Sequence, residues 1–551
     1  MSAPVTAASL VLAGLFIAYP LFALVAASLY DGGVTLAYYQ ALAADTALPG
    51  AVKNTLLMSL VSTLAAAMIG AAGAWLTERV RLPVRQLWRL LFVFPVLVPS
   101  YVLSIAWQHW AGPVGLLNKL AAGVLGGPLW RLEGLAGITF VMAVSHAPII
   151  YLLVRSALNA IPAELEEASR IAGAGPVKVF RTVTLPLVFP AIAGGCLLAF
   201  ASAIDNFGIP AFIGIPSGVT VLSTLIYQKV IGLGSGQFEQ AAALAVVTAI
   251  AAIVPVYLNN AFFKAARYRQ EGAQRSVAPA ELGRGKDGCM LLLVLWHALV
   301  TAGPFAAMVL VSLTAAYGVP LSLNTLSLAH YSALFSEVSA VKEGLLNSLL
   351  LAAGTTLGVL LLAWPVARGS SLKAGAVYKW LDAIGAIPYC LPGMVVGLAV
   401  LMAWLRPIPG ADFSFYGGLA LLFLAYLPRF FTFGVRAWSA AWSRFSTALE
   451  DAGRVAGAGA LKVIWRIILP LFRGEALGAM LLIFLLAFTE LTLSAILAGS
   501  QSRTLGVVLF GLEAAGSALE SAALGTLITL FSVVLAYFAA RFVLGGRSHE
   551  Y

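Results

Sequence analysis

The sequence predicts an all-α polytopic membrane protein with about twelve transmembrane helices in two parallel six-helix repeats. Three observations carry this prediction: the apolar composition, apolar runs of transmembrane length, and an internal repeat. Of the 551 residues, 61% are hydrophobic and only 10% are charged, whereas a soluble domain is about 45–50% apolar and about 25% charged. This composition excludes a soluble enzyme, and it also excludes a disordered chain, which needs low hydrophobicity.

The apolar runs set the number of spans, because a helix needs about 20 apolar residues to cross the hydrocarbon core. No Lys or Arg precedes Lys53, so the first run lacks the basic start of a cleavable signal peptide and is expected to remain as a span. The spans predicted in the first part of the chain are 8–29, 52–76, 88–107, 135–157, 188–213 and 238–262. Those in the second part are 289–313, 344–366, 380–405, 416–438, 474–499 and 519–541.

The distribution of basic residues predicts that both termini are cytoplasmic. In that orientation, 26 of the 33 Lys and Arg residues fall in cytoplasmic segments, as the positive-inside rule requires. The same basic loops account for the net charge of +10, so no nucleic-acid partner is expected. One long polar segment, residues 263–288, is expected to be a flexible cytoplasmic linker between a first half, residues 1–262, and a second half, residues 289–551.

The two halves are similar in sequence. Leu165–Leu187 and Leu449–Leu471, which lie 284 residues apart, are identical at 13 of 23 positions without a gap. Since each half holds six spans, both copies start on the same side, which predicts parallel repeats with the pathway between them. At an offset of 293, Asn54, Pro95 and Pro99 correspond to Asn347, Pro388 and Pro392, and Pro388 and Pro392 predict a helix irregularity in the second half.

The most similar segments lie in two predicted cytoplasmic loops, residues 160–187 and 444–471, each after the fourth span of its half. In the first loop, Pro162 suits the start of a helix, and Gly173-Ala174-Gly175-Pro176 suits its end. Gly457-Ala458-Gly459 makes the corresponding turn in the second loop. A short, exposed helix is therefore expected across the mouth of each half.

The first loop, Glu167-Ala168-Ser169-x3-Gly173-x9-Val183-x-Leu185-Pro186, resembles the EAA loop of binding-protein-dependent ABC importer permeases. The second loop, Asp451-Ala452-Gly453-x3-Gly457-x9-Ile467-x-Leu469-Pro470, has Asp in place of Glu, so unequal contacts with a partner are expected. The resemblance covers both halves. It implies the type I importer permease fold and a coupling helix in each loop that docks on an ATPase. The ATPase-coupling positions are Glu166, Glu167, Ala168 and Gly173, with Glu450, Asp451, Ala452 and Gly457 in the second loop.

The energy source is expected on other subunits. The sequence contains no GxxxxGK[ST] phosphate loop, so no cofactor is expected in this chain, and ATP and Mg²⁺ are expected on partner ATPase subunits. Because the halves are fused, one chain should dock two copies of a cytoplasmic ATP-binding subunit. The resemblance also implies an extracytoplasmic substrate-binding protein, a multi-pass location in the bacterial inner membrane, and contact with membrane lipid. The chain itself is expected to perform no chemistry.

Because its two halves are fused and each carries an EAA-like loop, the chain looks most like the ferric-iron branch of the family. The segment Asp205-Asn206-Phe207-Gly208-Ile209-Pro210 strengthens that resemblance; thiamine and polyamines are the alternative cargoes. Asp205, Asn206 and Glu490 are the candidate pathway residues, because intramembrane acids tend to face a cavity or a partner. Free carboxylates there would attract a trivalent cation, while the alternative is that both acids are paired or solvated at the outer interface.

A secondary transporter of the major-facilitator type is the alternative from another class, since it also has twelve spans in two parallel halves. It would need neither an ATPase nor the duplicated loops. No metal site is predicted in the chain, because its three cysteines lie far apart and its histidines lack ligand spacing. His146 and His297, which fall within predicted spans, are expected in hydrogen-bonded core or interface positions.

Overall fold

A computed structural model describes residues 14–232, 234, 236–266, 285–316, 325–336, 339–372, 375–405 and 414–545. This part of the chain is almost wholly helical and contains no strand, only two isolated β-bridges. The all-α prediction is therefore confirmed. Most of the predicted linker, residues 263–288, lies outside the described residues.

The first half begins with its first span, a short surface helix and a long second span. These are η1 (Gly14–Ala18), α2 (Tyr19–Leu29), α3 (Ala37–Ala43) and α4 (Ala47–Arg79). The next helices are α5 (Arg85–Leu97), α6 (Ser100–Ala111), α7 (Leu116–Leu125), α8 (Gly134–Asn159), α9 (Ala163–Ile171) and α10 (Pro176–Val179). The half ends with η2 (Phe180–Thr184), α11 (Leu185–Asp205), η3 (Pro210–Gly214), η4 (Ile215–Ser217), α12 (Leu222–Ile231) and α13 (Gln237–Ala266).

The second half repeats this order. It begins with α14 (Gly285–Trp296), η6 (His297–Ala302), α15 (Gly303–Ser312), α16 (Ala329–Ser336), α17 (Ser339–Ser371), α18 (Ala376–Cys390) and α19 (Gly393–Trp404). It continues with α20 (Leu419–Trp442), α21 (Thr447–Val455), α22 (Ala460–Val463), η8 (Ile464–Ile468) and α23 (Leu469–Leu471). The last helices are α24 (Arg473–Phe488), α25 (Thr492–Leu497), α26 (Leu505–Ala514) and α27 (Ala518–Gly545).

Where the structure describes them, the predicted spans are mainly helical, but several are bent or interrupted. Among the described residues, seven helices are long and apolar enough to cross a membrane, or up to eleven if each bent pair is one span. Two predicted spans, 88–107 and 380–405, are bent by 108°, where α5 meets α6 and where α18 meets α19. The bend in the second of them agrees with the irregularity expected at Pro388 and Pro392. Pro99 and Pro392 stand at these bends, and a proline disfavours the helical conformation of the residue before it.

The fifth and eleventh spans end earlier than predicted. The predictions run to residues 213 and 499, whereas α11 ends at Asp205 and α24 at Phe488. Asn206 Oδ1 accepts a hydrogen bond from the Ile209 amide at 2.9 Å, and Glu490 Oε1 accepts one from the Leu493 amide at 2.6 Å. Each polar side chain thus caps the short helical segment that follows it and breaks the long one.

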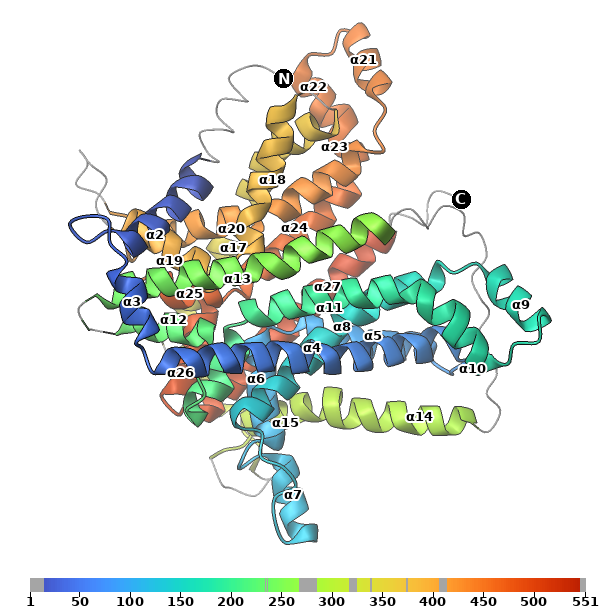
Figure 1. The fold of residues 1–551 in the computed structure, drawn as a ribbon, viewed down its shortest axis with the longest axis vertical. Helices are drawn as coiled ribbons and strands as arrows, with labels where there is room; N and C mark the ends of the chain where they lie inside the picture. Colours follow the sequence, from blue (N-terminus) through green and yellow to red (C-terminus); the bar gives the residue numbers. More distant parts are fainter. Residues whose placement is uncertain are drawn as a thin grey trace.

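The two halves exchange their first spans. In Figure 1, α2 of the first half lies against α19 of the second. Likewise, α15 of the second half packs against α6 of the first, and η6 contacts α5. The Tyr19 hydroxyl donates to the Ala403 carbonyl at 3.1 Å, and the His297 ring stacks on Trp88 with centroids 5.9 Å apart. The hydrophobic core therefore continues from one half into the other.

Equivalent hydrogen bonds confirm the internal repeat. The Asn54 side chain donates to the Thr220 carbonyl at 3.0 Å, and the Asn347 side chain donates to the Arg503 carbonyl at 2.9 Å. Both bonds tie the start of the second span to the segment before α12 or α26. The sequence correspondence at an offset of 293 is therefore also a structural one.

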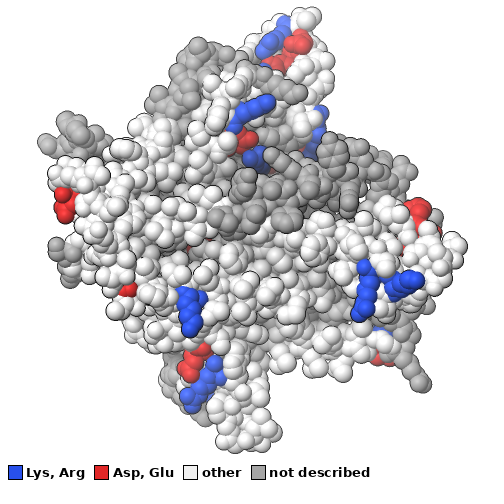
Figure 2. Space-filling model, in the orientation of Figure 1, with Lys and Arg blue, Asp and Glu red and all other residues white. Residues whose placement is uncertain are grey.

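The outer surface is largely apolar. On the face shown in Figure 2, charged side chains are few and gather toward the edges of the molecule. Along α4, the exposed residues Leu56, Leu60, Leu64 and Met68 recur every four positions. Such a stripe suits a helix that faces lipid hydrocarbon.

Candidate functional site

Both predicted loops form a short helix, a glycine turn and a second short helix. Gly173 follows α9 with φ of +83°, and Gly457 follows α21 with φ of +78°. A Cβ at either position would meet nothing within 4 Å, so glycine is favoured there by the left-handed backbone rather than by lack of space. Figure 1 shows α9 and α21 projecting at the outer ends of their halves.

The adjacent residues Glu166 and Glu167 have different surroundings. Glu166 is buried at 4% exposure, and its Oε1 lies 3.2 Å from Arg79 Nη2 and accepts a hydrogen bond from Thr184 Oγ1 at 3.0 Å. Glu167 and Ala168 are exposed. Glu166 therefore fastens α9 to the end of α4, while Glu167 and Ala168 are open to a partner.

The second loop has the same arrangement. Glu450 is 7% exposed and accepts hydrogen bonds from Arg368 Nη2 at 2.8 and 2.9 Å and from Arg454 Nη2 at 2.6 Å. Asp451 and Ala452 are exposed. The eight predicted coupling positions thus divide into two buried anchors and six exposed residues, since Gly173 and Gly457 are also exposed.

Sequence reasoning missed the two arginines that hold these anchors. At an offset of 293, Arg79 corresponds to Leu372, and Arg368 corresponds to Trp75. The arginine of the second half therefore lies four residues earlier, one helical turn, which hides the equivalence in an ungapped comparison. One sequence feature could still have identified these arginines. Each lies in the last turns of the second span of its half, on the same predicted cytoplasmic side as the loop that carries the glutamate.

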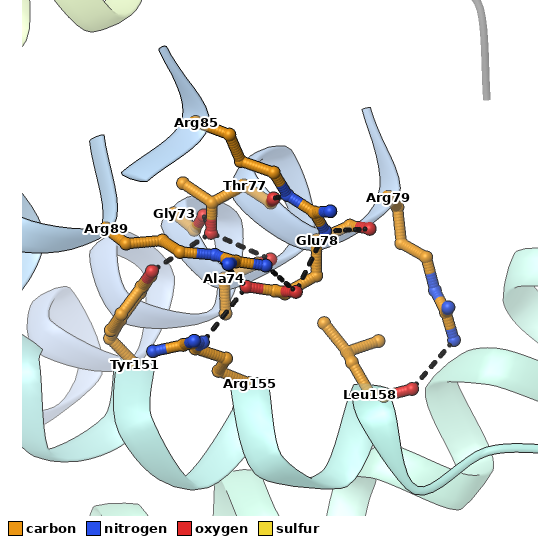
Figure 3. A network of polar contacts seen from close by, with 10 residues as sticks. All are labelled: Gly73, Ala74, Thr77, Glu78, Arg79, Arg85, Arg89, Tyr151, Arg155 and Leu158. Carbon is orange, nitrogen blue, oxygen red and sulfur yellow. Dashed lines mark hydrogen bonds and ion pairs between the residues drawn. The ribbon is translucent and has the colours of Figure 1, made fainter. Parts of the chain in front are cut away.

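The first half also contains a charged network behind its loop. Figure 3 shows the Glu78 carboxylate beside Arg85, Arg89 and Arg155, at distances of 2.8 to 3.0 Å. Glu78 is 2% exposed, so the network joins the ends of α4, α5 and α8 inside the protein. At an offset of 293, Glu78 corresponds to Ser371, and the second half lacks this carboxylate.

Asp205, the first predicted pathway residue, joins the two halves. Its Oδ2 accepts a hydrogen bond from Arg429 Nη2 on α20 at 2.6 Å, and its Oδ1 accepts one from the Gly393 amide. Arg429 also donates to the carbonyls of Pro388 at 3.0 Å and Leu391 at 2.6 Å. The end of α11 is therefore attached to the bend between α18 and α19, and Asp205 is not a free carboxylate in this conformation.

Glu490, the other predicted pathway acid, is also bound within the protein. Its Oε2 accepts hydrogen bonds from the Tyr426 hydroxyl at 3.0 Å and from the Ser494 amide at 3.1 Å. Asn206 and Glu490 correspond at an offset of 284 and, as described above, both cap a helical segment. A role of Asp205, Asn206 and Glu490 in the translocation pathway stays a prediction.

The two histidines predicted in spans have hydrogen-bond partners, as expected. His146 Nε2 lies 3.0 Å from Ser202 Oγ, and His297 Nδ1 lies 3.1 Å from Thr301 Oγ1. Among the described residues, no group of three or more His, Cys, Asp or Glu side chains is arranged to hold a metal ion.

Comparison with known proteins identifies the family. Residues 66–268 match the family described as "Binding-protein-dependent transport system inner membrane component". This chain belongs to the ABC importer permeases. The ferric transport system permease protein FbpB of Actinobacillus pleuropneumoniae is 24% identical over 507 residues, covering 89% of this chain and 70% of that protein.

Two other relatives extend the comparison. A probable ABC transporter permease protein of Sinorhizobium fredii, y4fN, is 24% identical over 549 residues, covering 96% of this chain and 94% of that protein. The molybdenum transport system permease ModB of Escherichia coli is 29% identical over 230 residues, 40% of this chain and 95% of that protein. A solved bacterial alginate importer chain covers 47% of this chain at 17% identity, with a TM-score of 0.38.

The family assignment decides the class of the protein. The permease is a multi-pass protein of the inner membrane and a subunit of an ABC importer. The major-facilitator alternative is excluded. The relatives that match along both halves agree with a fused permease.

Proposed function

We propose that this permease imports ferric iron delivered by an extracytoplasmic binding protein, and that two copies of a cytoplasmic ATP-binding subunit drive the transport. The observation that carries the coupling part is the pair of exposed helices α9 and α21, each anchored by a buried glutamate. Both termini and both helices lie on the cytoplasmic side in this proposal, as the distribution of Lys and Arg favours.

The relatives support ferric iron as the cargo. FbpB proteins match this chain over 83–89% of its length, whereas the molybdenum and putrescine permeases match 36–40% of it. The Asp205–Arg429 pair removes one argument for a cation, because the carboxylate charge is neutralised in this conformation. The proposal of ferric iron as the cargo is therefore supported by the relatives alone, and thiamine and polyamines stay as alternative cargoes.

The geometry offers a route for the motion of a docked ATPase. A displacement of α9 passes to α4 through Glu166 and Arg79, and to α11 through the helix that continues from Pro176 to Asp205. At the end of α11, Asp205 holds Arg429 of the other half. In the proposed cycle, this inter-half ion pair breaks and re-forms as the halves change between inward-facing and outward-facing arrangements.

Uptake of radiolabelled ferric iron by cells with and without the gene tests the cargo, with thiamine and putrescine measured in parallel. Loss of iron uptake alone supports the proposal, and loss of uptake of another cargo alone overturns the iron assignment. Purification of the tagged permease tests the partners. Two ATP-binding subunits per permease are expected, and a permease that transports without any ATP-binding subunit contradicts the coupling proposal.

A further inference from the structure

A cavity of about 720 Å³ lies in the first half, behind α9. Its walls come from α4, α8 and α11 and from the segment that runs from α9 through α10 to η2. Trp75 and Phe180 form part of the wall, with ring centroids 6.3 Å apart in an edge-to-face contact. A volume of this size falls within the range of about 300–1,000 Å³ that is typical of ligand sites.

The internal repeat explains why the first half has this space. Four residues that line the cavity correspond in the second half to large aromatic residues. By the offsets of 293 and 284, Ala71, Val154, Leu158 and Val188 correspond to Trp364, Trp438, Trp442 and Phe472.

The four aromatic residues of the second half form one cluster behind α21. The Trp364 ring lies 4.8 Å from Trp438, 5.4 Å from Trp442 and 5.9 Å from Phe472, measured between centroids. Trp438 and Trp442 are buried. The space that is empty behind α9 is thus filled by aromatic side chains behind α21.

The lining of the cavity suits an amphipathic ligand. Most of it is aliphatic or aromatic, while Arg79, Glu166 and Arg170 lie together at one part of it. Glu166 is 3.2 Å from Arg79 and 3.3 Å from Arg170, so these three side chains carry one net positive charge. The Arg170 side chain is 54% exposed and can reach a group outside the cavity.

The cavity opens toward the lipid-facing surface. Ala72 of α4 and Leu185 of α11 line it and are themselves exposed. Four residues further from the loop on the same helix faces, Met68 is 69% exposed and Phe189 is 58% exposed. The entrance therefore adjoins side chains that face hydrocarbon, and its charged side adjoins the loop at the end of the membrane-spanning helices.

We propose that this cavity binds an acyl chain of an anionic phospholipid, with the lipid phosphate beside Arg170. The bound chain occupies the space that the aromatic cluster fills in the second half, so it supports α9 as the rings support α21. The lipid comes from the leaflet on the α9 side. This assignment of the cytoplasmic leaflet rests on the orientation in the proposed function, whereas the site itself does not depend on the cargo.

The test is native mass spectrometry of the detergent-purified full-length permease, followed by identification of the lipids it releases. The wild-type protein is expected to retain one phospholipid, enriched in anionic headgroups. Ala71→Trp with Val154→Trp, which copies two rings of the second half, is expected to lose it. Leu64→Trp is the matched control, because Leu64 is an exposed residue of α4 outside the cavity lining, and it is expected to retain the lipid.

A second variant keeps the test valid if the double substitution does not fold. Arg170→Gln changes an exposed side chain and is expected to reduce the anionic enrichment without removing the acyl chain from the cavity. Retention of the same lipid by the folded, filled variant would overturn the proposal, as would a wild-type protein that holds only detergent or an unrelated apolar molecule. None of these readouts depends on iron uptake, so failure of the cargo assignment is distinguishable.

Discussion

The two coupling loops have nearly the same backbone but different supports. Behind α9 lie the Glu78 network and the cavity. Behind α21 lie four packed aromatic rings, and the Arg368 guanidinium is 5.1 Å from the Trp442 ring centroid. The residues that face a partner resemble each other, whereas those behind them differ. This difference agrees with the proposal that a similar subunit docks on each loop, since docking would constrain the exposed turn more than the packing beneath it.

The helices that leave the two loops also differ. In the first half, residues 176–205 form one continuous helical span. In the second half, the corresponding segment bends by 77° between Leu471 and Arg473. Phe472, at this bend, belongs to the aromatic cluster, while its counterpart Val188 lines the cavity. A large ring at this position therefore accompanies the change in helix direction.

The ion pair of Asp205 with Arg429 has no equivalent in the repeat, because the counterparts of these two residues are Thr489 and Ser145. Substitution of Asp205, together with the second predicted pathway acid Glu490, is therefore the strongest test of how far the halves differ in function. Asp205→Asn with Glu490→Gln removes the carboxylates while leaving both coupling loops unchanged. Iron uptake is expected to fall by about 5- to 150-fold, which is the factor that corresponds to typical coupling free energies between two sites. The ATP-binding subunits are expected to stay bound. Unchanged uptake would contradict a role for either acid in transport.

The aromatic support of α21 can be broken by Trp438→Ala. This substitution empties a buried site and leaves the Leu360 carbonyl without the indole donor that lies 2.9 Å away. The expected loss of stability is about 3–5 kcal/mol, measured by thermal unfolding of the purified protein. Val154→Ala, at the corresponding position of the first half, should cost less because it removes far fewer buried atoms and because Val154 already borders a cavity.

The charged support of the first half can be broken by Glu78→Gln. Three arginines then surround a neutral amide, with an expected cost of about 3 kcal/mol, the lower end for removal of one partner from a buried ion pair. Ser371→Ala is the control in the second half and is expected to leave the unfolding temperature unchanged. Equal effects of the two substitutions would show that the network is not a specific support of the first loop.

Anchoring and docking can be separated at adjacent positions of α9. Glu166→Ala leaves the buried Arg79 without its carboxylate partner and is expected to cost about 3 kcal/mol of stability, as for Glu78→Gln. Glu167→Ala changes an exposed side chain, so stability should stay within about 0.5 kcal/mol while binding of the ATP-binding subunit weakens. Thermal unfolding and copurification measure the two effects, and a reversed pattern would exchange the assigned roles.

The smallest expected effect is on the opposite side of the molecule. The hydrogen bond from Lys229, with Nζ 2.6 Å from Asp45 Oδ2, lowers the pKa of Asp45. Because the folded pKa lies below the unfolded one, the pair contributes stability above the unfolded pKa, and that contribution is lost as the pH falls through the folded pKa. The pair is near the surface, so about 0.2–1 kcal/mol is involved. Asp45→Asn should flatten this acid dependence of the unfolding temperature.

The sequence predicted those features that depend on local composition and spacing. Apolar runs predicted membrane-spanning helices, and the matching loop segments predicted the helix, glycine turn and helix at both ends of the molecule. The prolines at 388 and 392 predicted an irregular helix, although not the size of its bend, and the equivalent bend at Pro99 was not predicted. These features could be read from the chain because each depends mainly on residues close together in sequence.

The tertiary structure decided which distant side chains meet. The exchanged first spans, the Arg79–Glu166 anchor and the Asp205–Arg429 pair each join segments that no periodicity relates. The cavity behind α9 likewise depends on four small residues from three helices converging on one place. A comparison of the two halves shows that these four residues are smaller than their aromatic counterparts. Only the packing of the three helices shows that they border one cavity, because a void forms only where several elements together leave space unfilled.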